Sequence, residues 1–118
     1  MAEYVYNAVQ TIQPGADAIM SQSIGCNNGN IYFRPETSQI TLRGRVTDPC
    51  KRFARYQVTA VANIAIPEGG TAGPISVALD INGNEVQTSK AIVTPAAAGD
   101  FFNVTSTMIV DVPASCCV

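Results

Sequence analysis

Short stretches that alternate apolar and polar residues recur along the whole chain, and turn-forming residues separate them. In 39–46 the apolar residues occupy even positions, whereas the polar side chains of Thr41, Arg43 and Arg45 occupy odd positions. Alternation with a period of two and one polar face is typical of a half-buried antiparallel strand. No stretch shows a convincing apolar stripe at helical spacing, so the pattern predicts an all-β protein.

Eight such stretches predict strands: 4–12, 18–24, 31–34, 39–46, 53–66, 75–81, 85–93 and 101–112. The stretch 53–66 is rich in alanine, but its β-branched residues favour a strand over a helix. Asn82-Gly83 predicts a type I′ hairpin turn, 67–74 is a loop, and 95–100 is a linker with room for one helical turn. Strands of this number and spacing predict an antiparallel β-sandwich, a jelly roll of about eight strands. The apolar end 115–118 resembles the start of another strand.

Length and composition predict how the chain is organised. A chain of 118 residues is expected to form a single domain over 1–118 with its own core. Only 14% of the residues are charged and 47% are hydrophobic, so a free monomer would have little charge to keep it soluble. We therefore expect a homo-oligomer or a larger assembly. No run is long enough to span a membrane, and the start lacks signal-peptide features, which predicts synthesis in a cytoplasm.

The residue types that most catalytic sites require are scarce. The chain has no histidine, which excludes Ser-His, Cys-His and His-metal arrangements. Its acidic residues are scattered, and no phosphate-binding or dinucleotide-binding motif is present. The sequence therefore predicts a protein that is not an enzyme and binds no cofactor.

Four cysteines are the only candidates for a redox or metal site. Zinc knuckles normally place two cysteines two to four residues apart, and this spacing does not occur, so no metal is expected. Free thiols in a reducing cytoplasm, often in buried positions, are favoured, and a disulfide is the alternative if the protein reaches an oxidising exterior. The candidate residues are Cys26, Cys50, Cys116 and Cys117.

Basic residues are concentrated in one segment, since six of the seven lysines and arginines lie within 34–55. Such a segment can contact an acidic protein, an anionic glycan or nucleic acid. Few aromatic residues are interleaved with it, which disfavours nucleic acid. A solvated face or a protein contact is favoured, with a glycan as the alternative. The residues proposed for partner contact are Arg43, Arg45, Lys51, Arg52 and Arg55.

Several segments resemble a known group of proteins: ITLRG at 40–44, ANIAIPEGG at 62–70, GPISVAL at 73–79, and the stretch from 102 to the Cys-Cys pair. They are similar to small uncharacterised proteins encoded in phages and prophages of Gram-positive gut bacteria. The resemblance covers most of the chain and implies a trimeric jelly roll of the tumour-necrosis-factor/C1q type. No motif in it is diagnostic of an activity.

From this resemblance and the low charge we expect a virion structural protein, an accessory capsid decoration or fibre-head component. In such a trimer 58–66 and 101–112 would fill the core and the subunit interface, whereas Arg43, Arg45 and the 67–74 loop would contact other virion proteins. Two alternatives remain. One is a carbohydrate- or receptor-binding module, which the absence of tryptophan disfavours. The other is a non-viral bacterial surface-appendage or spore-coat subunit.

Overall fold

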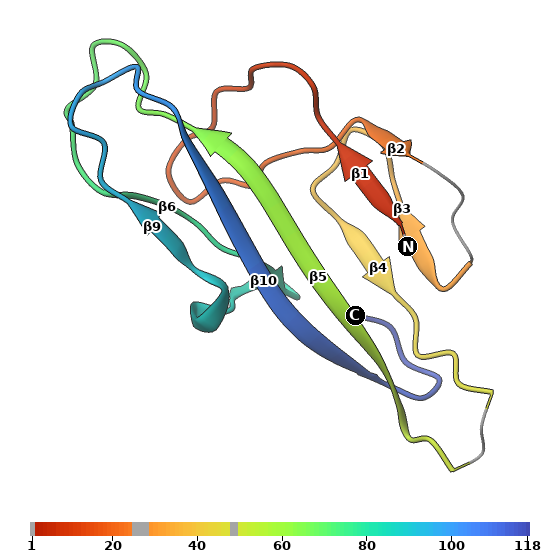
Figure 1. The fold of residues 1–118 in the computed structure, drawn as a ribbon. Helices are drawn as coiled ribbons and strands as arrows, with labels where there is room; N and C mark the ends of the chain where they lie inside the picture. The colour runs from red at the N-terminus through yellow and green to blue at the C-terminus, as the bar shows by residue number, and fades with distance from the viewer. Residues whose placement is uncertain (1, 25–28, 48–49) are drawn as a thin grey trace. The chain divides into compact units, whose positions relative to one another are not determined.

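The computed structural model describes residues 2–24, 29–47 and 50–118, and strands are its main regular structure (Figure 1). A single turn of 3-10 helix, η1 (Gln87–Ser89), is present, and the described residues contain no α-helix. The all-β prediction is therefore confirmed. The strands are β1 (Glu3–Val5), β2 (Gln22–Ile24), β3 (Ile31–Phe33), β4 (Ile40–Leu42), β5 (Phe53–Ile64), β6 (Ile75–Val77), β7 (Asp80–Ile81), β8 (Asn84–Glu85), β9 (Ala91–Val93) and β10 (Phe102–Pro113).

The strands pair into small two-stranded sheets: β1–β2, β3–β4, β5–β10, β6–β9 and β7–β8. Each predicted stretch contains at least one strand, but most strands are shorter than predicted. Two predictions need correction, because 75–81 divides into β6 and β7, and 85–93 divides into β8, η1 and β9. The helical turn forms at η1 rather than in the 95–100 linker.

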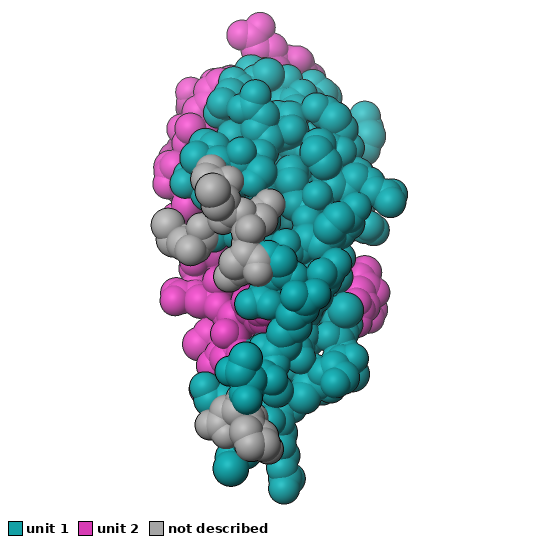
Figure 2. Space-filling view, turned by 90° about the vertical axis from the view of Figure 1, so that its right-hand side faces the viewer, with its two compact units in different colours: residues 1–54, 111–118 teal, residues 55–110 magenta. Residues whose placement is uncertain are grey.

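The chain divides into two compact units, one made of residues 1–54 and 111–118 and the other of residues 55–110 (Figure 2). In the first unit the apolar core contains Phe33, Leu42 and the fully buried Val112. The ring of Tyr4 lies 4.4 Å from that of Phe33, and burial raises the pKa of the Tyr4 phenol. The single domain over 1–118 stays a prediction.

The C-terminal residues pair with the free side of β4 in the first unit. The Val118 amide donates to the Leu42 carbonyl at 2.9 Å, and the Gly44 amide donates to the Cys116 carbonyl at 2.8 Å. This end, which resembles the start of a strand in sequence, forms an isolated antiparallel bridge between Cys117 and Arg43 and no strand. Gly44 is required there, because a Cβ atom on it would lie 1.9 Å from the Pro113 carbonyl oxygen.

In the second unit, β7 and β8 form the predicted hairpin. Ile81 pairs with Asn84, which leaves Asn82 and Gly83 as a two-residue loop. Their φ angles are 51° and 83°, and a type I′ turn requires positive φ at both positions. The prediction made from Asn-Gly is confirmed.

β5 and β10 form a ribbon of two 12-residue strands. Thr107 Oγ1 donates to Thr59 Oγ1 at 3.3 Å, and Asn103 Nδ2 donates to Asn63 Oδ1 at 3.0 Å. The second contact lies four residues later on β5 and four residues earlier on β10, so the strands run antiparallel. Even-numbered residues of β5 are half-buried and odd-numbered ones exposed, as alternation with a period of two predicts.

A buried serine pair joins β10 to η1 within the second unit. The Ser106 hydroxyl donates to the Ser89 carbonyl, and both residues are buried. Ser89 Oγ accepts the Leu79 amide at 2.9 Å and donates to the Val86 carbonyl at 2.7 Å. One buried hydroxyl therefore satisfies two backbone groups at the point where the predicted strand 85–93 is interrupted.

Candidate functional site

Arg43, which was predicted to be exposed for partner contact, is half-buried and makes contacts within its own unit. Its Nη1 donates to the Gly29 carbonyl at 3.1 Å, and its Cζ lies 5.9 Å from the centroid of the Tyr32 ring. β4 ends at Leu42, so the strand predicted to place Arg43 and Arg45 on one face is shorter than expected. The guanidinium of Arg43 thus binds the chain before β3, and its contact with a partner stays a prediction.

The other basic residues are exposed. Arg45 approaches the same turn as Arg43, since its Nη1 would lie 3.6 Å from a Cβ atom on Gly29. Lys51 and Arg52 follow in the first unit, whereas Arg55 belongs to the second unit. The structure thus brings Arg43 and Arg45 together at Gly29, and it assigns the predicted contact residues to two separate units.

Three of the four candidate cysteines lie within the described residues. Cys50, Cys116 and Cys117 are exposed thiols, although such thiols are often buried. Their exposure follows from their places in a turn and at the C-terminal end. Cys26 lies outside the described residues. No group of three His, Cys, Asp or Glu side chains in the described ranges is placed to hold a metal ion.

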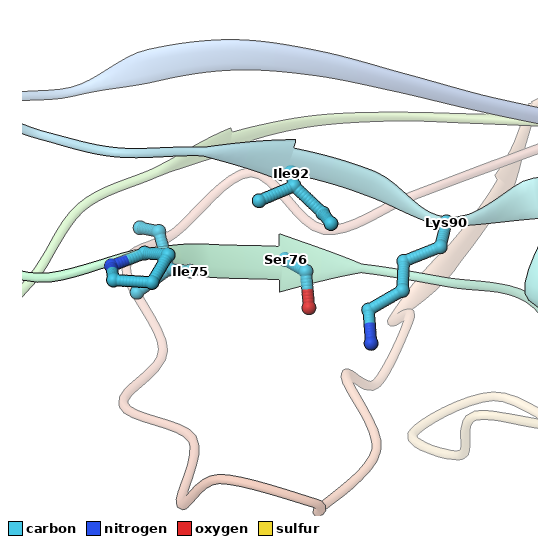
Figure 3. Close-up of a pocket in the computed structure, with 5 residues that line it drawn as sticks. Ile75, Ser76, Lys90 and Ile92 are labelled. Atoms are coloured by element: carbon cyan, nitrogen blue, oxygen red, sulfur yellow. The ribbon is translucent and has the colours of Figure 1, made fainter.

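A shallow hollow of about 260 Å³ lies on the exposed side of the β6–β9 pair (Figure 3). Its polar side chains are Ser76 and Lys90, and the Lys90 ammonium lies 3.5 Å from a carboxylate oxygen of Glu85. Ile92 lies across from Ser76 and is largely exposed. The described part of the chain contains no helix that is long and apolar enough to cross a membrane.

The exposed face of the β5–β10 ribbon is the most distinctive surface. Val61 is 63% exposed and Ile109 is 65% exposed, and the paired Thr59–Thr107 and Asn63–Asn103 side chains lie on the same face. No charged residue occurs in 56–67 or in 101–110. The Thr59–Thr107 pair separates the two apolar residues, so this face mixes apolar and uncharged polar side chains. The resemblance implies that 58–66 and 101–112 fill the core and a subunit interface. In the structure the side chains of β5 and β10 alternate between more buried and exposed positions.

Comparison of the chain with protein-family models, with curated proteins and with solved structures found no match. Two surfaces of the molecule bear on its function. One is the exposed face of the β5–β10 ribbon, which carries no charge from 57 to 63 or from 103 to 109. The other is the basic turn, formed by Arg43 and Arg45 beside Gly29.

Proposed function

We propose that the protein is a non-enzymatic virion structural protein, an accessory capsid decoration or fibre-head component that acts through homo-oligomeric assembly. The observation that carries this proposal is the β5–β10 ribbon, which exposes Val61 and Ile109 on strands without charged residues between 56 and 67 or between 101 and 110. Soluble monomers normally carry charges on such a surface. We therefore expect this face of the ribbon to be buried against other chains.

The resemblance to phage and prophage proteins supports the viral part of the proposal, and it also supports a trimeric jelly roll. In such a trimer the odd-numbered face of the ribbon would line the subunit interface, and the even-numbered face would line the core. The protein would be made in the host cytoplasm and would function in the virion. The low proportion of charged residues, 14%, agrees with an assembled state.

Contact with other virion proteins is assigned to the basic turn, with Arg45 as its exposed cation. Arg45→Glu should lower incorporation of the protein into particles about fivefold, because reversing one contact charge costs about 1 kcal/mol. Arg45 is a better test than Arg43, whose guanidinium also holds the Gly29 carbonyl. The measurement is the amount of this chain per purified particle, obtained by quantitative mass spectrometry.

The matched control is Glu3→Lys, which reverses a charge at another exposed position of the first unit. It should leave incorporation and thermal stability unchanged. If the Arg45 variant were incorporated as well as the unchanged protein, the basic turn would not be the contact.

One observation favours the carbohydrate-binding alternative. Tyr32 is 49% exposed and lies beside the Arg43 guanidinium, and aromatic rings of this kind can pack on the apolar face of a sugar. A glycan array probed with the purified chain distinguishes the two functions. Binding that is lost in Tyr32→Ala would favour the carbohydrate-binding module over the assembly role.

A further inference from the structure

We infer that the outer edge of β5 pairs antiparallel with β5 of a second copy of this chain, across a two-fold axis. The inference rests on the proposed assembly role and adds a defined contact to it. A trimer formed through the ribbon faces would be joined in pairs by this edge.

The backbone groups at the outer edge of β5 can be assigned from the register of the ribbon. The Ala114 amide donates to the Arg52 carbonyl at 2.9 Å, in the same register as the Thr59–Thr107 contact. In an antiparallel pair the hydrogen-bonded positions alternate with positions whose N–H and C=O groups point away from the partner. Even-numbered residues of β5 therefore bond to β10, and residues 57, 59, 61 and 63 direct their backbone groups outward.

The side-chain contacts agree with this assignment. Opposite side chains approach most closely where the backbone groups point away from the partner strand. The side-chain hydrogen bonds across the ribbon are found at such positions, Thr59–Thr107 and Asn63–Asn103. The outer edge of β5 thus carries a regular series of outward donors and acceptors.

This edge lacks the features that normally prevent strand addition. Edge strands are usually short or blocked by lysine, proline or a bulge. β5 has 12 residues, and within the described residues β10 is its single hydrogen-bonded neighbour. No proline, glycine or charged residue occurs from 56 to 66. No blocking residue between 56 and 66 therefore opposes pairing with an extended strand of another chain.

The edge of β5 matches a second copy of itself. In antiparallel pairing centred on Ala60, Gln57 lies opposite Asn63 and Thr59 lies opposite Val61. Amides then face amides and β-branched side chains face each other, which is favourable across strands. Each Arg55 lies opposite residue 65, so the two arginines do not meet.

The β10 edge is less suited to the same arrangement. Self-pairing centred on Ser106 would place the amide of Asn103 opposite the apolar side chain of Ile109. From 56 to 66 the β5 edge carries no charge that would attract a charged foreign strand, and a second β5 needs none there. Because antiparallel self-pairing is isologous, it closes after two copies.

Val61→Lys tests the inference, since a lysine at this position introduces like charges close to each other in the paired edges. Light scattering of the purified full chain should give an even multiple of 12.4 kDa, and the variant should have a smaller mass, because Val61 belongs to the paired edge and also to the exposed face of the ribbon. Val9→Lys is the matched control. Val9 is 86% exposed and lies outside every strand, so the same substitution should leave the mass unchanged. Circular dichroism confirms that both variants are folded.

Hydrogen exchange of single amides distinguishes edge pairing from packing of the ribbon faces. In the assembled protein the outward amides of Thr59 and Val61 should exchange as slowly as the inward amide of Ala60. In Val61→Lys the outward amide at Thr59 should exchange at least tenfold faster, while Ala60 stays protected.

Three results would overturn the inference. A trimer with rapidly exchanging outward amides would exclude the edge contact and leave the proposed assembly role in place. A mass that grows continuously with concentration would indicate pairing of β5 with β10 edges instead. A monomer in which the outward amides exchange rapidly would contradict both the edge contact and the assembly role.

Discussion

Gly44→Ala is expected to lower the free energy of unfolding by about 3 kcal/mol, the upper end of the range for overpacking a tight site. The new Cβ atom would lie 1.9 Å from the Pro113 carbonyl oxygen and 2.8 Å from its carbonyl carbon. These are backbone atoms, so no side-chain rotation can relieve the contact. The C-terminal segment would have to move away, which breaks the bonds of Gly44 to Cys116 and Ser115.

Urea denaturation of the purified variant measures this loss. Gly73→Ala is the matched control, because a Cβ atom on Gly73 meets nothing within 4 Å. The control should change the free energy of unfolding by less than about 0.5 kcal/mol. A Gly44 variant as stable as the control would show that the C-terminal segment does not pack against Gly44 as described.

Ser89→Ala is expected to lower the free energy of unfolding by about 2 kcal/mol, because it leaves the part-buried Leu79 amide without its acceptor. Ser89 Oγ is the acceptor for the Leu79 amide and the donor to the Val86 carbonyl. Alanine can do neither, and water does not reach a residue that is almost fully buried. The midpoint of thermal or urea unfolding measures the effect.

Ser76→Ala provides the comparison for a serine that is exposed, and its stability should be unchanged. Ser106→Ala should also be destabilising, since its hydroxyl donates to the Ser89 carbonyl. Because the two serines share one network, their effects in the double variant should not add. Additive losses would indicate that the serine pair does not act as a unit.

The features that could be predicted from the sequence are those that depend on neighbouring residues. The Asn82-Gly83 turn follows from the φ preferences of two residues, and the alternation in β5 follows from the geometry of one strand.

The features that could not be predicted depend on contacts between residues far apart in the sequence. The burial of Ser89 and the interruption of 85–93 depend on Ser106, which is 17 residues away. The requirement for glycine at position 44 depends on Pro113. Alternation places Arg43 on the polar face of its strand, whereas the position of its guanidinium depends on Gly29 and Tyr32.

The solution mass of the purified full chain tests the central claim most directly. Size exclusion with light scattering, with and without reductant, should give a multiple of 12.4 kDa that reductant does not change. Independence from reductant is expected because the proposed contacts are backbone pairing and apolar packing, not disulfides between the exposed thiols. A monodisperse species of 12.4 kDa at micromolar concentration would contradict the assembly role.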